Sequence, residues 1–261
     1  MRSREEWINL ARQYYQERAI NGLDRNQANY RNRFSDFMGR LAENSRTPDE
    51  LREQFDGLAK DYLEFGYDPL FGPNFICASS FMACKIEELK PKRVLDTGCG
   101  IGFDLLFRAR HFPEIEFVGC DMSPKMIETA RAHATLMGIR NTKFLEIAHE
   151  DLSPENLGGV VDLCTLDSAL FYKGFDGLVK NLRGVSRILR DEGIFILCGP
   201  VDEKMGTNEH VCRIVGFSSL RDQLVVNTHD TRFSLSVFQK IEDPTEEIVQ
   251  IRLALALQPQ W

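Results

Sequence analysis

The sequence predicts an α/β protein built on an open, doubly wound sheet in which strands and helices alternate. Two stretches support this prediction. In residues 94–104, VLDTGCGIGFD, an apolar run and an acid lead into three glycines at every second position, and residues 105–110 then continue as a helix. One strand–helix unit later, an apolar run ends at Asp121 and is followed by Ser123 and Pro124, a pair typical of a helix start. This alternation predicts a parallel sheet.

The composition is that of a soluble globular protein, with 43% apolar and 27% charged residues among 261. The net charge of −7 argues against a general binder of nucleic-acid backbones, which is usually basic. No apolar run approaches the roughly 18 residues that span a bilayer, and the N-terminus lacks the apolar stretch of a secretory signal. The seven cysteines form no CxxC pair and show no His/Cys metal spacing. We therefore expect a cytoplasmic protein with reduced thiols, no bound metal and no membrane contact.

Residues 1–90 are predicted to form a helical cap. Apolar residues at helical spacing predict a first helix over about 7–18, and two more are expected over about 27–43 and 74–89. The sequence Thr-Pro-Asp-Glu at 47–50 is typical of another helix start. The cap is longer than an α/β core requires, which favours a lid over the site.

Three aromatic residues of the cap, Tyr62, Tyr67 and Phe71, are candidates to line the pocket under such a lid. Aromatic residues at helical spacing also pack as ordinary core or dimer contacts, and both interpretations stay open. Residues 242–261 form a C-terminal extension. Its Pro244 lies in a helix-start signal, although the apolar residues that follow alternate as in a strand, and we expect a helix.

The glycine-rich turn is the first candidate for a binding site. It consists of Gly98, Cys99, Gly100, Ile101 and Gly102. Glycine is needed where the backbone takes positive φ, or where a ligand approaches the chain without a Cβ in the way. The free N–H groups of the following helix would face that ligand.

Two acids beside the turn indicate which ligand it binds. A dinucleotide-binding turn has a third glycine where Phe103 stands here, and Asp96 at the lip of the turn would repel a pyrophosphate and attract a cation. Asp121 ends the second strand, where an acid accepts hydrogen bonds from both ribose hydroxyls. A cationic group together with a ribose predicts S-adenosylmethionine as cofactor, with S-adenosylhomocysteine as product.

With these residues, the sequence resembles the class I S-adenosylmethionine-dependent methyltransferases from about Pro91 to Lys240. VLDTGCGIG resembles the first motif of that family, VGCDMSPKMIETARAHATLMGI its second strand and helix, and LRDEG at 189–193 its late turn. The resemblance implies a Rossmann-like core over 91–241. It also implies that 224–227 and 233–240 form an antiparallel pair, which gives a seven-stranded sheet in the order 3-2-1-4-5-7-6.

The resemblance also implies where the adenine lies. Met122 and Met126 would flank the ring, although plain core packing is the alternative for both. Similar enzymes place an Asp directly after the third strand to contact the adenine amino group, and Ala148 stands there in this sequence. Glu150 or Asp151 would then take over the hydrogen bond, or His149 would stack on the ring, unless it is an exposed loop histidine.

The fourth strand, residues 160–166, ends where the methionine part of the cofactor meets the acceptor. Leu166 and Asp167 are therefore candidate cofactor contacts, and Asp167 would hold the ammonium group, take a proton from the acceptor, or cap the next segment. Tyr62 completes the candidate cofactor contacts. Four residues are candidate general bases, and no motif selects one of them: His149, Asp167, Tyr172 and His210.

The predicted function is methyl transfer from S-adenosylmethionine to a small-molecule acceptor held under the cap. The sequence lacks the Asn/Asp-Pro-Pro-Tyr/Phe element associated with methylation of nucleobase amino groups, so a nucleic-acid acceptor is disfavoured. The alternatives are an RNA or protein methyltransferase and a protein that binds the cofactor without transferring its methyl group. A homodimer formed through the N-terminal helices or the C-terminal tail is a further hypothesis.

Overall fold

A computed structural model describes residues 1–18, 36, 47–65, 72–167, 174–200, 210–227 and 232–256 of the chain. The strands are β1 (Arg93–Thr97), β2 (Glu116–Asp121), β3 (Thr142–Glu146), β4 (Val161–Asp167), β5 (Leu189–Pro200), β6 (Phe217–Asn227) and β7 (Arg232–Lys240). The helices are α1 (Arg4–Arg18), α3 (Pro48–Phe65), α4 (Gly72–Leu89), α5 (Phe103–His111), α6 (Pro124–Leu136), the 3-10 turn η1 (His149–Asp151), α7 (Pro154–Leu157), α8 (Gly174–Ile188) and α10 (Glu246–Ala256). The predicted helix over 27–43, together with Tyr67, Phe71 and Tyr172, falls outside the described residues, apart from the helical Asp36.

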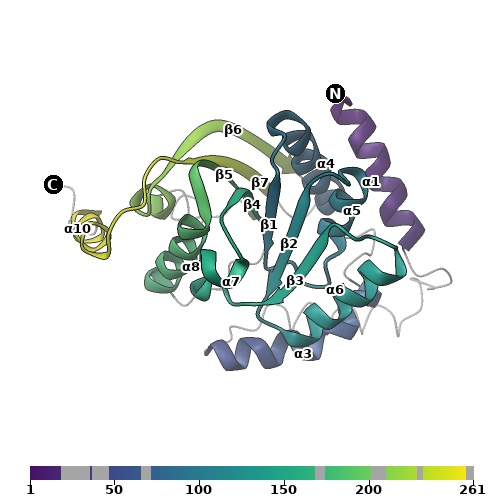
Figure 1. Ribbon diagram of the computed structural model, residues 1–261, viewed down its shortest axis with the longest axis horizontal. Helices are drawn as coiled ribbons and strands as arrows, with labels where there is room; N and C mark the ends of the chain where they lie inside the picture. Colours follow the sequence, from purple (N-terminus) through teal and green to yellow (C-terminus); the bar gives the residue numbers. More distant parts are fainter. Residues whose placement is uncertain are drawn as a thin grey trace.

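The seven strands form one sheet in the order β3-β2-β1-β4-β5-β7-β6, which confirms the predicted topology. The first five strands in this order pair in parallel, and β7 pairs antiparallel with both β5 and β6. Helices cover both faces of the sheet (Figure 1). Because β1 lies in the middle, between β2 and β4, its carboxyl end opens at the point where the strand order reverses, which is where such sheets bind ligands.

Strand β5 begins earlier than the sequence pattern predicts. Residues 190–193 read as a turn before the strand, yet they belong to β5 and form an irregularity in its pairing with β4. Glu192 takes φ of +60° there, so the expected sharp change of direction occurs within the strand. The irregularity lies at the amino end of β5, away from the site.

Helices α1 and α4 pack as part of the core. Trp7, Tyr14 and Met82 are buried in the same hydrophobic cluster as residues of β1, α5 and β2. Trp7 stacks on Phe112 with ring centroids 5.3 Å apart, and its indole N–H donates to Glu87 of α4 at 3.1 Å. The predicted domain division at residue 90 therefore does not coincide with a break in the hydrophobic core.

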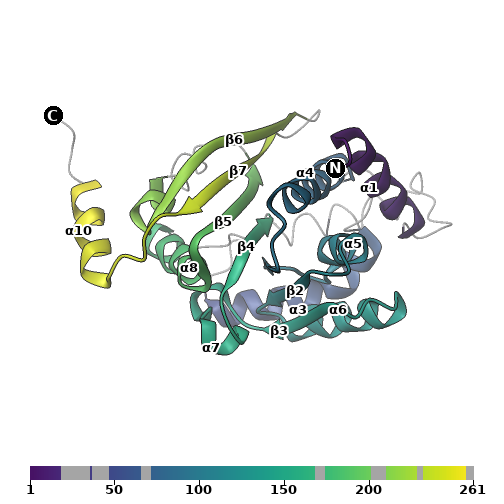
Figure 2. The same cartoon turned by 45° about the horizontal axis from the view of Figure 1, so that its top comes forward.

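Helix α3 lies alongside α6 (Figures 1 and 2). Its start is capped as predicted, because the Glu50 N–H donates to the Thr47 hydroxyl at 3.2 Å. Arg52 donates to the Met122 carbonyl at 3.2 Å. Asp56 accepts hydrogen bonds from the Ser123 hydroxyl and from the Lys125 N–H, at the first turn of α6. These contacts join α3 to the segment that follows β2.

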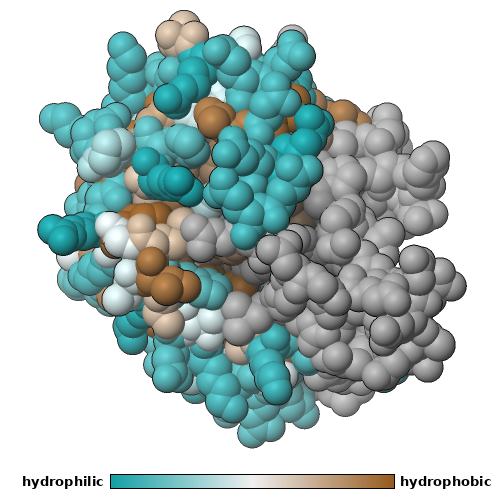
Figure 3. Space-filling view, turned by 90° about the vertical axis from the view of Figure 1, so that its right-hand side faces the viewer, coloured by the Kyte–Doolittle hydropathy of each residue, from teal (hydrophilic) through white to brown (hydrophobic). Residues whose placement is uncertain are grey.

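The C-terminal tail forms the helix α10, as expected from its start signal. Val249 is buried, while Arg252 donates to the Ile214 carbonyl at 3.1 Å and pairs with Glu242 at 2.7 Å. The hypothesis of a homodimer stays a prediction. None of the described helices is both long and apolar enough to cross a membrane. Hydrophilic residues dominate the described surface on the side seen in Figure 3.

Candidate active site

The glycine turn after β1 adopts the backbone that its sequence predicts. Gly98, Gly100 and Gly102 have φ of +71°, +52° and +75°, which side chains with a Cβ rarely adopt. A Cβ on Gly102 would also lie 2.8 Å from the ring of Phe144, so this glycine allows α5 to pack tightly against β3. A Cβ on Gly100 would meet nothing within 4 Å. The backbone of Gly100 is therefore open to a ligand.

Asp121 holds the turn in place from the end of β2. Its carboxylate accepts hydrogen bonds from the Gly100 N–H at 3.0 Å and from the Ser123 N–H at 2.9 Å. Ser123 in turn caps α6, because its hydroxyl accepts from the Met126 N–H at 3.1 Å, as the sequence predicts. Burial raises the pKa of Asp121 to about 6, although these backbone hydrogen bonds oppose the rise. A ligand that donates to this carboxylate would stabilise its ionised form.

A cavity of about 150 Å³ opens above the carboxyl ends of the central strands. It is lined by ten residues that the sequence analysis selected: Tyr62, Asp96, Gly98, Cys99, Gly100, Asp121, Met122, Met126, His149 and Asp167. Further lining comes from Phe55, Phe75, Ile101, Phe103, Asp104, Ile147 and Ala148. The structure thus brings the turn, the predicted adenine corner and the end of β4 around one space.

Other predicted site residues lie away from this cavity. Leu166 is fully buried in the sheet, and Gly102 packs behind the turn rather than lining the space. Glu150 and Asp151 are exposed on η1 and absent from the lining. His210 is an exposed residue of a short helical segment before β6 and is likewise absent from the lining.

Asp96 does not stand free at the lip of the turn. Its carboxylate is buried and pairs with the buried Arg108 guanidinium of α5 at 2.5 Å, and it also accepts from the Thr165 hydroxyl at 2.7 Å. A buried ion pair needs such additional hydrogen bonds to offset the loss of hydration. The charge of Asp96 is therefore already balanced within the protein by Arg108. If the cavity attracts a cationic ligand, the negative charge must come from other residues.

Three further carboxylates supply that negative charge: Asp104, Asp121 and Asp167. Two of them affect Tyr62 of α3, because burial and the charges of Asp121 and Asp167 raise the pKa of its phenol. The phenol is consequently neutral at pH 7. The cavity retains an excess of negative charge, as a cationic ligand requires.

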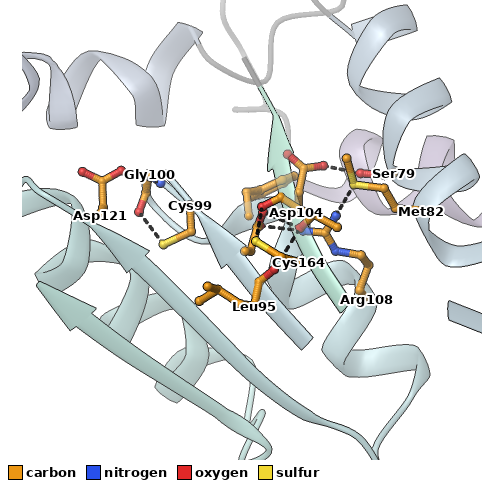
Figure 4. Close-up of polar contacts among 12 residues, drawn as sticks. Ser79, Met82, Leu95, Cys99, Gly100, Asp104, Arg108, Asp121 and Cys164 are labelled. Carbon is orange, nitrogen blue, oxygen red and sulfur yellow. Dashed lines mark hydrogen bonds and ion pairs between the residues drawn. The ribbon is translucent and has the colours of Figure 1, made fainter. Parts of the chain in front are cut away.

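Asp104 is a lining residue that the sequence analysis did not select. Its carboxylate accepts hydrogen bonds from the hydroxyls of Tyr15 in α1 and Ser79 in α4. Figure 4 shows Asp104 and Asp121 on opposite sides of the glycine turn. The sequence signal was present, since Asp104 is an acid in the first turn of the helix that directly follows the glycine turn.

His149 occupies the corner of the cavity after β3. Burial lowers the pKa of its imidazole to about 4, so the ring is neutral at pH 7. The backbone of Thr97 at the end of β1 opposes this lowering, because it favours the protonated ring. Its Nε2 atom is buried without a hydrogen-bond partner among the described residues.

Cys99, the cysteine within the turn, is not activated for nucleophilic chemistry. Burial and the neighbouring carboxylates of Asp121 and Asp96 raise the pKa of Cys99, so its thiol stays protonated at pH 7. Across the described parts of the chain, no cluster of three or more His, Cys, Asp or Glu residues has an arrangement that could hold a metal ion.

Comparison with known proteins decides the family. The model of a family described as "Methyltransferase domain" matches residues 88–244, which is more than half of the chain. The chain belongs to this methyltransferase family. The resemblance of its motifs to S-adenosylmethionine-dependent methyltransferases is thereby confirmed.

Individual relatives of this methyltransferase are distant. An arsenite methyltransferase from Halobacterium salinarum is 29% identical over 133 residues, which cover 49% of the chain and 34% of the relative. A 23S rRNA (uracil(1939)-C(5))-methyltransferase from Shewanella denitrificans is 28% identical over 113 residues, covering 42% of the chain and 23% of the relative. The chain thus spans about a third or less of these two relatives.

A solved structure shares the fold of the methyltransferase. Magnesium protoporphyrin IX methyltransferase from Synechocystis PCC 6803, crystallised with bound SAM, superposes with a TM-score of 0.60 at 14% identity. The superposition covers 76% of this chain and 100% of that one.

The cavity of the methyltransferase fits the cofactor of its family. The open backbone at Gly100 allows close approach of a ligand, and Asp121 offers an acceptor beside it for ribose hydroxyls. The apolar side chains of Met122 and Met126, which follow Asp121 along the chain, also line the cavity. The carboxylates of Asp104 and Asp167, which also line the cavity, match a group that carries an ammonium and a sulfonium charge.

Proposed function

We propose that this protein transfers a methyl group from S-adenosylmethionine to a small-molecule acceptor enclosed beneath α3. One observation carries the proposal. The cavity that joins the open glycine turn to Asp121 is also lined by Phe55 and Tyr62 of α3, so the predicted cofactor site and the aromatic side chains of this helix share one space. A space of this kind can hold a metabolite and exclude water.

The two ends of the cavity support one orientation of the cofactor. Asp121 would accept hydrogen bonds from the ribose hydroxyls, with Met122 and Met126 against the adenine. Asp104, on the other side of the turn, and Asp167 would face the ammonium and sulfonium groups. Tyr15 and Ser79 would orient Asp104 through their hydroxyls.

The bound cofactor supplies an electrophilic methyl carbon, and the residues of the chain position the acceptor and exclude water. Transfer requires the reacting atoms to approach within about 3–3.5 Å in a straight line. Phe75, Phe103 and Tyr62 supply the apolar wall against which an acceptor would be held.

Asp167 is the carboxylate at the end of β4 and our candidate to accept a proton from the acceptor. It lies opposite Cys198 of β5 in the sheet, and its charge adds to burial in raising the pKa of that thiol. Tyr62 holds its proton too tightly to act as a base at pH 7, and it would act as a hydrogen-bond donor. His210 is exposed and outside the cavity lining, so we no longer propose it as the base.

Small acceptors fit the chain better than macromolecules do. The net charge of −7 disfavours the phosphate backbone of RNA, and the cover by α3 disfavours a large substrate. The named acceptors of similar proteins include arsenite and magnesium protoporphyrin IX, and also one uracil of ribosomal RNA. RNA or protein methylation is therefore the alternative to be tested.

The experiment uses S-adenosylmethionine with an isotope-labelled methyl group. The protein is incubated separately with a small-metabolite extract, with total RNA and with a protein extract, and Asp121→Asn serves as the control. We expect label in the metabolite fraction, at least about tenfold less with the variant. Label confined to RNA or protein would overturn the proposed acceptor class. Binding of S-adenosylhomocysteine without transfer to any fraction would overturn the methyl-transfer activity itself.

A further inference from the structure

The cavity is lined by charges of one sign. Among the lining residues that the structure describes, none is a lysine or an arginine, and His149 is neutral at pH 7 because burial lowers its pKa to about 4. Four carboxylates line the same space, those of Asp96, Asp104, Asp121 and Asp167. The charge of Asp96 is balanced by its buried ion pair with Arg108. The charge that the other carboxylates offer to a ligand is negative.

Asp104 and Asp121 carry charges that their hydrogen-bond donors solvate but do not cancel. Asp104 accepts hydrogen bonds from the hydroxyls of Tyr15 and Ser79. Asp121 accepts from two backbone N–H groups, at 3.0 and 2.9 Å, and with a pKa of about 6 it is mostly ionised at pH 7. Because all of these donors are neutral, both side chains keep a negative charge.

Two further acids strengthen this negative potential. The charge of Asp167, at the end of β4, adds to burial in raising the pKa of the Tyr62 phenol and of the Cys198 thiol. The charge of Asp56 in α3 helps to raise the pKa of Asp121. Negative charge therefore reaches the cavity from α3, β2, β4 and α5.

The cofactor of the proposed function does not use up this charge. At pH 7 S-adenosylmethionine carries an ammonium, a sulfonium and a carboxylate, and so one net positive charge. Asp104 and Asp121 together carry one negative charge more than this, before Asp167 is considered. The loaded cavity is thus still negative, and the acceptor enters a negative potential.

The apolar part of the cavity favours the same kind of acceptor. Its aromatic side chains come from three helices: Phe55 and Tyr62 from α3, Phe75 from α4 and Phe103 from α5. The face of an aromatic ring attracts a cation and repels an anion. The wall therefore adds to the preference that the carboxylates set.

We infer that the methyl acceptor is a cationic amine, which is methylated at its nitrogen atom. The inference rests on the proposed function and names its acceptor class. The ammonium group of the acceptor gives a proton to the Asp167 carboxylate, and the nitrogen lone pair then forms the bond to the methyl carbon. The bond from that carbon to sulfur breaks as this happens, and its electron pair stays on sulfur.

This reaction keeps the positive charge inside the negative cavity. The charge moves from sulfur to nitrogen and is spread over both atoms in the transition state, where nearby carboxylates stabilise it. A carboxylate or phenolate acceptor would instead bring another negative charge into the cavity and would cancel the positive charge during transfer. The lining of this cavity opposes the binding of such an anion.

The test separates a small-metabolite extract by ion exchange at pH 7 into cationic, neutral and anionic fractions. Each fraction is incubated with the protein and with S-adenosylmethionine that carries a labelled methyl group. We expect at least about tenfold more label in the cationic fraction than in either other fraction. The label should also resist hydriodic acid under conditions that cleave O-methyl groups.

Each result has a distinct meaning. Label mainly in the anionic or neutral fraction, or release of the label from the cationic product by hydriodic acid, would overturn the inference and leave the proposed function standing. Transfer to none of the three fractions would instead refute the proposed function.

A pair of variants tests the charge directly. Phe75→Lys places a positive charge on the cavity wall, and Phe75→Met is the matched control of similar length without a charge. With the cationic fraction at a limiting concentration, transfer should be about tenfold slower in Phe75→Lys than in Phe75→Met. Calorimetry should give both variants the same affinity for S-adenosylhomocysteine, which has no net charge. Equal transfer rates in the two variants would overturn the inference, and if Phe75→Lys fails to fold, the three fractions alone decide.

Discussion

The raised pKa of Asp121 predicts that cofactor binding weakens in mild acid. In the free protein this pKa is about 6, because the carboxylate is buried. Ribose hydroxyls that donate to the carboxylate favour its ionised form, so binding lowers the pKa and releases a proton. With a pKa of about 6, about nine-tenths of the protein is ionised at pH 7 and about one-tenth at pH 5, which predicts about tenfold weaker binding at pH 5.

Calorimetry of S-adenosylhomocysteine binding between pH 5 and 7 measures this effect, and buffers with different ionisation enthalpies reveal the released proton. His149 does not interfere, since its pKa is lowered to about 4. The control is Asp121→Asn, checked for folding by circular dichroism, which should bind weakly with no change over this range. A flat wild-type profile, or the same slope in Asp121→Asn, would refute the assignment of Asp121 to the ribose.

Three further predictions follow from contacts around the turn. Arg108→Met should destabilise the fold by about 3 kcal/mol in urea unfolding, because it strands the buried Asp96 carboxylate, and adding Asp96→Asn should recover part of the loss. Gly100→Ala should fold with a stability penalty of about 1–2 kcal/mol, because alanine rarely adopts the positive φ of this position. It should bind S-adenosylhomocysteine at least about tenfold more weakly, because the added methyl group enters the cavity, and undiminished binding would contradict this. Tyr15→Phe removes the hydroxyl that donates to Asp104, so it should weaken binding of S-adenosylhomocysteine. It should not weaken binding of 5′-methylthioadenosine, which lacks the amino-acid part that Asp104 is proposed to face. Equal losses for both ligands would leave Tyr15 a purely structural role.

The fold was predictable because its signals are local. Three glycines at every second position have one common use, which is a run of positive φ at a ligand, and all three adopt it. Ser123 before Pro124 marks the start of α6 through a contact with a residue only three positions away. Apolar runs of strand length that lie between such turn and helix-start signals then predict the strands. The strand order came from the resemblance to a family and is confirmed.

The pairing of Arg108 was not predictable from the same kind of signal. The sequence places it in a helix two residues before Arg110, and spacing alone does not distinguish a buried arginine from an exposed one. Arg108 is buried because α4 covers this part of α5, bringing Met82 against its guanidinium. That contact joins segments 26 residues apart. From sequence alone, an acid such as Asp96 is therefore expected to be unpaired and available to a ligand until its neighbours in space are known.

The sequence left the role of α1 open for a similar reason. Its apolar face fits a lid and a core helix equally well, because periodicity shows that a face is buried and not what covers it. In the structure that face packs on α5, and the Tyr14 hydroxyl donates to the Phe103 carbonyl at 3.1 Å, directly beside the glycine turn. Among the described N-terminal helices, α3 supplies Phe55 and Tyr62 to the cavity, and α4 supplies Phe75.

The contact between Asp56 and the first turn of α6 allows one backbone amide to report whether α3 is docked on α6. The Lys125 N–H is one of the amides that a helix cannot satisfy from within, and it donates to Asp56 of α3 at 3.2 Å. The neighbouring Met126 amide is held by Ser123, within its own segment. Deuterium uptake at Lys125 relative to Met126 would thus measure the fraction of time that α3 spends undocked. Slower uptake at Lys125 alone in the presence of S-adenosylhomocysteine would show that the cover and the nucleoside stabilise each other.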